Sequence, residues 1–195
     1  MSKDVVSRTL SVHQEHELLI KLEAAGLNKD IAQAIINSKG NELAKKMIEV
    51  VDVKPTYNII VDYNRSLADM IKAGNYDWVN SDINAKHFPI KGKGKHELTA
   101  TLFHFDRYIE SDDAIAEMDK QGYRPATIEE LPALGEKYPE LQKEFPIVAL
   151  GSVWRGPSGD RYVAYLGWNG LERGLSLGWF GDGWGAGWRF LALRK

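Results

Sequence analysis

Residues 166–190 read LGWNGLERGLSLGWFGDGWGAGWRF, and this stretch decides how the end of the chain folds. Five of the six Trp and 11 of the 18 Gly lie between Gly151 and Trp188, so the aromatic and glycine enrichment is local. Glycine permits tight turns and positive φ angles. Tryptophan supplies a large contact area with few torsions to immobilise. The stretch therefore predicts short strands whose connecting turns display aromatic side chains.

Strands and helices are predicted on either side of this stretch. After Pro146 the chain contains four β-like runs, IVALGSVWR, RYVAYLGW, LSLGWF and WRFLALRK, separated by glycine-containing turns. Two helices precede them. Ser111 begins the first and Gly122 ends it, whereas the capping box Thr127–Glu130 begins the second, which Pro132 shortens or bends. Helices followed by a β-rich end predict an α+β protein rather than a parallel α/β sheet.

A strand, a helix and a second strand are predicted between residues 54 and 110. TYNIIVDY (56–63) is rich in aromatic and β-branched residues, as strands are. Ser66 then begins a helix that Gly74 ends. HELTATLFHF (96–105) alternates as a strand does, and its pattern allows it to pair with residues 56–63. We expect this segment, 54–110, to pack on the module formed by residues 111–195.

Residues 15–51 have the spacing of three short helices, which makes residues 1–53 a helical region. The first helix has an apolar stripe and ends at Gly26, and the second begins at Asn28 and ends at Gly40. The third has an apolar face formed by Leu43, Met47 and Val50. Residues 15–51 carry five Lys and six acidic residues, which gives them no basic face for DNA phosphates. A homo-oligomer or a docked partner is the better interpretation of these helices.

Composition excludes several classes of protein. The 195 residues carry 25 Lys+Arg and 27 Asp+Glu, so a strongly basic nucleic-acid binder is not expected. The chain contains no Cys, which excludes disulfides, thiol nucleophiles and thiolate metal sites. No stretch has the roughly 18 apolar residues of a membrane helix, and the N-terminus lacks the apolar run of a signal peptide. We expect a cytoplasmic protein with no membrane partner.

Three pieces of the sequence together carry a resemblance to a known fold. AIAEMDKQGYRPATIEEL (114–131), GSVWR (151–155) and GWRFLALRK (187–195) occur in the order found in the C-type lectin-like fold, in its sulfatase-modifying-factor form. Residues 112–195 resemble that fold. The resemblance implies an α+β protein in which the helical N-terminal region precedes a module with two helices and a small antiparallel sheet.

Within that superfamily, the chain looks most like the variable proteins of diversity-generating retroelements. Those proteins present an aromatic- and glycine-rich segment, just before a fixed final strand, as a diversified ligand-binding face. Residues 167–188 occupy the corresponding place here. The resemblance therefore implies a binding protein, by analogy of fold.

Two chemistries of the superfamily do not carry over to this chain. Its formylglycine-generating enzymes use cysteines, and this chain has none. Its calcium-dependent sugar sites use E-P-N or Q-P-D with W-N-D, but here Trp168-Asn169 is followed by Gly170 and neither tripeptide occurs. No metal, no cofactor and no catalytic residue are therefore predicted.

Histidines supply the candidates for an alternative function. His13 and His16 are three residues apart, without a third metal ligand at a recognised spacing. His104 precedes Asp106 at a strand end, where a carboxylate could orient it as a general base. The KGKGK turn (91–95) opens a strand rather than a helix, so a phosphate site is not predicted there.

The sequence favours a non-catalytic protein that binds a protein or other macromolecular ligand. Trp154 and Trp188 lie inside β-like runs and are predicted to be core. Two other interpretations stay open, namely an enzyme of the same superfamily that uses His104 with acidic neighbours, and a structural or regulatory protein that acts through its N-terminal helices. The predicted ligand-binding residues are Trp168, Asn169, Leu171, Ser176, Trp179, Phe180, Asp182 and Trp184.

Overall fold

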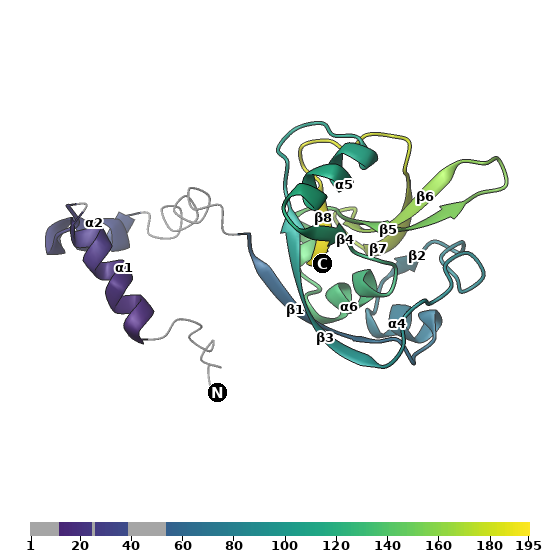
Figure 1. Cartoon of the computed structure of the whole chain (residues 1–195), viewed down its shortest axis with the longest axis horizontal. Helices are drawn as coiled ribbons and strands as arrows, with labels where there is room; N and C mark the ends of the chain where they lie inside the picture. The colour runs from purple at the N-terminus through teal and green to yellow at the C-terminus, as the bar shows by residue number, and fades with distance from the viewer. Residues whose placement is uncertain (1–11, 25, 39–53) are drawn as a thin grey trace. The chain divides into compact units, whose positions relative to one another are not determined.

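The computed structural model describes residues 12–24, 26–38 and 54–195, in two units divided after residue 53 (Figure 1). In the first unit, α1 (Val12–Ala24) ends before Gly26, whose φ of +101° is the left-handed conformation expected after a helix. The Asn28 side-chain oxygen accepts the Ile31 N–H at 3.0 Å and so caps α2 (Lys29–Ser38), as predicted. The third predicted helix lies outside the described residues.

The second unit is built on an eight-stranded mixed sheet with the order β1-β3-β8-β5-β6-β7-β2, and β4 pairs with β8. The β5/β8 and β2/β7 pairs are parallel, and all other pairs are antiparallel. The two strands of segment 54–110, whose pattern allows pairing, do pair as β1/β3. The strands are β1 (Thr56–Asp62), β2 (Trp78–Val79), β3 (Lys95–Phe103), β4 (Tyr123–Pro125), β5 (Ile147–Arg155), β6 (Arg161–Trp168), β7 (Arg173–Trp179) and β8 (Arg189–Arg194).

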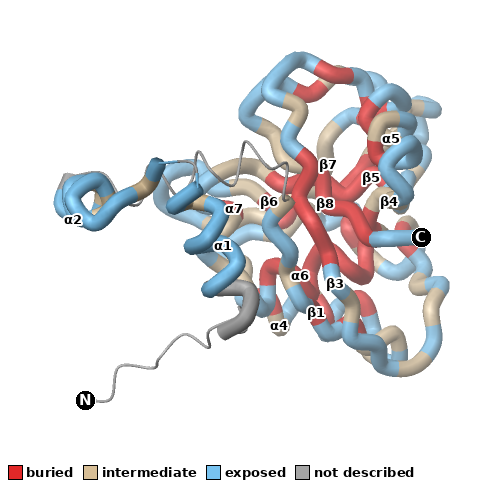
Figure 2. Tube along the Cα trace, turned by 60° about the vertical axis from the view of Figure 1, so that its left-hand side comes forward, coloured by how far each residue is buried: buried red, intermediate tan, exposed pale blue. Residues whose placement is uncertain are grey.

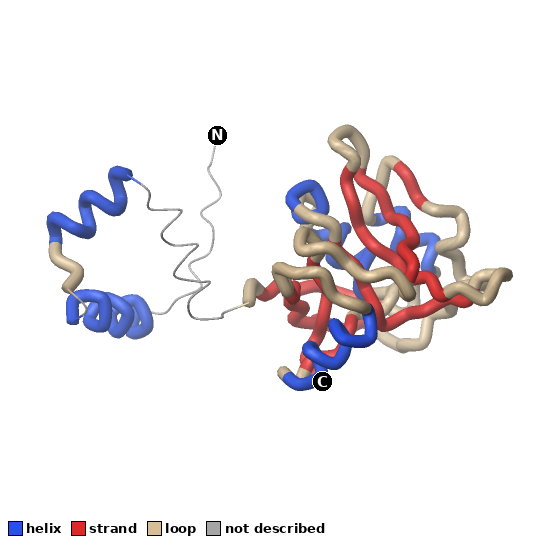
Figure 3. The backbone as a smooth tube through the Cα atoms, turned by 90° about the horizontal axis from the view of Figure 1, so that it is seen from above, coloured by secondary structure: helices blue, strands red, loops and turns tan. Residues whose placement is uncertain are grey.

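The predicted fold class is wrong. A helical N-terminal region followed by a module with two helices and a small antiparallel sheet was expected. The structure instead has one large mixed sheet and six short helices among its described residues, and residues 54–195 are mostly strand and loop (Figure 3). The reason lies in β8, where Phe190–Leu193 are all buried, as in a central strand covered on both faces. Such a strand needs a neighbour at each edge, and β3 and β5 supply them.

Two apolar clusters cover the two faces of the sheet, and the buried residues concentrate on the central strands (Figure 2). One cluster joins the sheet to α4 (Leu67–Ala73) and α6 (Glu130–Lys137) through Leu67, Leu131 and Leu134. The other joins the opposite face to α5 (Ser111–Lys120) through Ala114 and Met118. Neither α7 (Leu141–Glu144) nor any other described helix is long and apolar enough to cross a membrane.

Local contacts explain where the helices begin. The Ser66 hydroxyl accepts the Asp69 N–H at 3.1 Å, so the predicted cap of α4 is confirmed. The capping box of α6 is only half formed, because the Glu130 carboxylate accepts the Thr127 N–H at 2.8 Å while the Thr127 hydroxyl has no partner among the described residues. Since α6 starts at Glu130, Pro132 lies in its first turn, where a missing N–H costs no helical bond.

Candidate functional site

The eight residues predicted to bind a ligand lie in three different environments. Trp168, Asn169 and Ser176 line a groove on β6 and β7, and the 91% exposed Leu171 lies in the turn between these strands. Trp179 and Asp182 line a separate depression at the other end of β7. Phe180 and Trp184 are each only 4% exposed.

Phe180 and Trp184 belong to the core, so their predicted role as ligand-contacting residues is corrected. The Trp184 indole Nε1–H donates to the Ser111 hydroxyl at 2.8 Å, and that hydroxyl donates to the Phe180 carbonyl at 2.7 Å. Both rings pack in the apolar cluster beneath α5. The connection from β7 to β8 thus folds inward over the sheet, because its large rings cover apolar strand residues and the buried indole N–H of Trp184 has a hydrogen-bond partner. Trp188, predicted to be core, is half-buried and packs edge-on to Trp184.

The groove has a volume of about 610 Å³ and is bounded by β2, β6, β7 and residues 142–146. Its aromatic lining comes from Trp78, Phe145, Tyr165 and Trp168. Trp78 and Trp168 are 50% and 45% exposed, respectively. The sequence did not predict Trp78 and Phe145 as groove residues. Trp78 lies in β2, which has only two residues, and both Trp78 and Phe145 lie outside the Trp- and Gly-rich stretch. Half-exposed Trp side chains that share one concave surface usually mark an interaction site.

Two glycines from adjacent strands form part of the lining where β6 and β7 pair. Gly167 and Gly174 are direct cross-strand partners, and Trp78 pairs with Gly174 from the other side. A Cβ built on Gly174 would lie 3.7 Å from the Trp78 ring, an ordinary van der Waals contact, so the missing side chain leaves usable space. The next cross-strand pair, Tyr165 and Ser176, also lines the groove.

Gln142 of α7 fixes one wall of the groove against the sheet. It is 2% exposed, and its Nε2 donates to the carbonyl oxygens of Gly167 at 2.6 Å and Gly174 at 3.1 Å. Its Oε1 accepts from Arg173 Nη2 at 3.0 Å, which orients the amide with its donors toward the sheet. Those two floor carbonyls are therefore already hydrogen-bonded before any ligand arrives.

Arg173 ties this wall to the helices behind it. Its guanidinium donates to the carbonyl oxygens of Gly74 (3.0 Å) and Asn75 (3.2 Å) after α4, and of Gly135 (3.0 Å) in α6. A cation at helix C-terminal carbonyls is favourable. The guanidinium also lies 5.2 Å from the Tyr76 ring centroid, and burial raises the pKa of the Tyr76 hydroxyl, which forms no hydrogen bond with the part of the chain that the structure describes. Arg173 therefore positions the groove from below rather than lining it.

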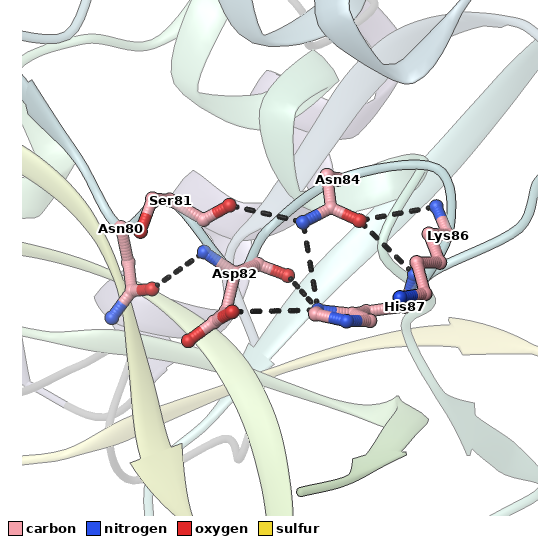
Figure 4. A network of polar contacts seen from close by, with 6 residues as sticks. All are labelled: Asn80, Ser81, Asp82, Asn84, Lys86 and His87. Atoms are coloured by element: carbon pink, nitrogen blue, oxygen red, sulfur yellow. Dashed lines mark hydrogen bonds and ion pairs between the residues drawn. The ribbon is translucent and has the colours of Figure 1, made fainter.

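A second aromatic group lies at the other end of the strands. Trp154, Tyr162 and Trp179 are cross-strand neighbours on β5, β6 and β7, with ring centroids 5.4 and 6.4 Å apart. His87 stacks on Trp154 at 4.2 Å and 12°. Trp154, predicted to be core, is half-buried between these rings. Figure 4 shows the loop that holds His87, whose Nδ1 lies 3.0 Å from the Asp82 carbonyl oxygen and 3.6 Å from its carboxylate. These contacts give His87 a packing role.

The residues of the predicted histidine–acid alternative lie apart from the groove. His104 Nε2 is 2.9 Å from the Ala186 carbonyl oxygen and 3.7 Å from the Asp106 carboxylate. His104 is exposed at the end of β3 and is absent from the lining of the groove. Within residues 12–24, 26–38 and 54–195, no group of three or more His, Asp or Glu is arranged to hold a metal ion.

Comparisons of this chain with protein-family models, with curated proteins and with solved structures found no match.

Proposed function

We propose that this protein is a non-catalytic binding protein of the cytoplasm and that the groove on β6 and β7 holds a segment of a partner protein. The observation that carries the proposal is the pair of half-exposed indoles, Trp78 and Trp168, that line a concave surface of about 610 Å³. Tryptophan is enriched among the residues that contribute most to protein–protein binding. The Gly167 and Gly174 carbonyls at the base of the groove are already hydrogen-bonded to Gln142. They therefore favour apolar ligand contacts in the centre of the groove and polar contacts at its rim.

A random dodecapeptide library selected on the immobilised full-length chain tests this function. We expect peptides whose affinity falls about tenfold or more in the Trp78→Ala and Trp168→Ala variants, because truncation of a hot-spot tryptophan typically costs about 2 kcal/mol or more and tenfold corresponds to about 1.4 kcal/mol. Affinity is measured by isothermal titration calorimetry.

Trp179→Ala is the matched control, because Trp179 is 47% exposed, close to the 45% of Trp168, and lies outside the groove. Its peptide affinity is expected to equal that of the wild type. A selection that yields no peptide dependent on Trp78 or Trp168 contradicts the proposed function. Loss of affinity in Trp179→Ala alone would place the site at the other end of β7.

The resemblance to variable proteins of diversity-generating retroelements belongs to the same proposal. A diversified binding face varies where side chains are exposed, so related sequences are expected to differ at Trp168, Asn169 and Leu171 and to keep the buried Phe180 and Trp184. An adenine-directed repeat and a reverse-transcriptase gene beside this gene would support diversification. Their absence from the neighbouring DNA would contradict diversification but would not affect the proposed binding role of the groove.

A second candidate function rests on the N-terminal helices. Leu18, Leu19 and Ile20 on α1, and Ile31 and Ile36 on α2, are large apolar side chains exposed within the described residues. Exposed apolar helix faces favour self-association, so this unit is a candidate oligomerisation module. Sedimentation velocity on the full chain tests it: Leu18→Glu/Ile31→Glu should dissociate an oligomer, and a monomeric wild type would contradict it. An enzyme built on His104 has less support, because that residue lies outside the groove.

A further inference from the structure

The charges that line the groove are unbalanced. Lys143, Glu144 and Glu172 contribute to the lining. The Lys143 ammonium is already paired with the Glu140 carboxylate at 2.8 Å. Glu144 and Glu172 form no ion pair with any residue that the structure describes, and both are exposed. The groove therefore presents two carboxylates that no cation of the described residues pairs with.

The nearby guanidinium groups of the chain do not satisfy these carboxylates. Arg173 donates to backbone carbonyls and to Gln142, as described above. The Arg189 guanidinium lies over the Phe145 ring at 4.6 Å and donates to the carbonyls of Gly187 and Trp188. Both cations are thus engaged in holding the fold.

Two of the four aromatic rings that line the groove, those of Trp78 and Trp168, are also open. In this chain Phe180, Tyr76 and Phe145 each have an arginine guanidinium 4.1–5.2 Å from the ring centroid. Within the described part of the chain, the Trp78 and Trp168 rings have neither a cation nor another ring against them. Indole is the best cation–π partner among the side chains.

We propose that the partner segment is basic, with an arginine or lysine side chain that lies against Trp78 or Trp168 while its charge contacts Glu144 or Glu172. This inference rests on the proposed function and adds the chemistry of the ligand. Charge complementarity selects this occupant: an acidic segment would place like charges against two unpaired carboxylates, which disfavours binding.

The peptides from the library selection supply the probes for the test. We expect the groove-dependent peptides to be enriched in Arg and Lys and to lose affinity about tenfold when those residues are replaced by Gln. On the protein, Glu144→Gln and Glu172→Gln should each weaken binding about two- to fivefold, the range of exposed ion pairs. The weakening should diminish as salt is raised, because exposed charges are screened.

Glu97→Gln is the matched control, because Glu97 is an exposed carboxylate on β3 that does not line the groove. The affinity of this variant for the selected peptides should equal that of the wild type. Groove-dependent peptides without basic enrichment, or binding indifferent to both Glu→Gln changes, would overturn this inference and leave the proposed function standing. The absence of any groove-dependent peptide would overturn both. Binding of a neutral oligosaccharide such as cellohexaose that requires Trp168, without binding of basic peptides, would also overturn the basic-segment proposal.

Discussion

Trp168 and Trp184 belong to one Trp- and Gly-rich stretch and have opposite environments. Trp168 ends β6, is 45% exposed and lines the groove, whereas Trp184 is 4% exposed and bonds to Ser111 beneath α5. Both directly follow a glycine, so the local sequence does not separate them. Long-range partners do: Ser111, far away in the sequence, accepts the indole N–H of Trp184, whereas no ring or cation of the described residues packs on Trp168, which stays half-exposed. The same residue type therefore supports the fold in one half of the stretch and is available for binding in the other.

Substitution of the two tryptophans gives the largest expected difference. Trp184→Ala should lower the free energy of unfolding by about 3–5 kcal/mol, because a buried ring is removed from a packed cluster. Trp168→Ala should change it by about 0.5 kcal/mol, as is usual for surface positions. Urea denaturation followed by circular dichroism measures both. Equal losses of stability in the two variants would contradict the division of the stretch.

The hydroxyl groups near each tryptophan extend the comparison. Ser111→Ala should destabilise the protein by about 1–3 kcal/mol, because the buried Trp184 indole N–H loses its acceptor and the Phe180 carbonyl loses its donor. Ser176→Ala, in the groove, should leave stability within about 0.5 kcal/mol. Thermal unfolding of the two variants side by side checks this pair. A Ser111→Ala variant as stable as wild type would show that Trp184 needs no partner.

Particular residues show how far sequence reasoning reached. Local signals located β1, β3, α4 and the strands after Pro146, because caps and alternating patterns act over a few residues. The mixed sheet was missed, because the parallel pairing of β8 with β5 joins residues that no local pattern connects. Of the residues predicted from the composition of the stretch to bind a ligand, Trp168, Asn169 and Ser176 line the groove. Trp78, Gln142 and Phe145 were missed because they reach the groove only through the tertiary fold.

Tyr76 tests how the groove is held from behind. Its buried hydroxyl has no hydrogen-bond partner within residues 12–24, 26–38 and 54–195, so Tyr76→Phe should raise the free energy of unfolding by about 1 kcal/mol at neutral pH. Burial also raises the pKa of this hydroxyl above its usual value of 10.0. The native state therefore binds this proton more tightly than the unfolded state does. The free energy of unfolding of the wild type is unaffected by this difference below pH 10 and falls as pH rises further, because ionisation of Tyr76 favours the unfolded state.

The stability advantage of Tyr76→Phe over wild type should therefore grow above pH 10. Chemical denaturation of both proteins at pH 7 and at pH values above 10 measures it. A constant or shrinking advantage would contradict the burial of an un-ionised Tyr76.

The smallest expected effect concerns the groove floor. Gly174→Ala should raise stability by about 0.5–1 kcal/mol, because glycine inside a strand is unfavourable and the new methyl meets Trp78 at an ordinary contact distance. The same methyl occupies groove space, so affinity for the selected peptides should fall. Gly178, also on β7, faces the core, and Gly178→Ala is the matched variant there. It should destabilise the protein, because the new Cβ would lie 2.9 Å from the Trp184 ring. Two variants that behave alike would contradict the contrast between groove and core.

Covalent labelling of the indoles, with and without a selected peptide, tests the central claim most directly. A tryptophan-specific reagent and mass spectrometry report the labelling rate at each of the six positions. We predict that Trp78 and Trp168 are labelled in the free protein and protected by the peptide, that Trp179 is labelled in both states, and that Trp184 is labelled in neither. Labelling of Trp184 as fast as Trp168, or protection of Trp179 in place of Trp78 and Trp168, would contradict it.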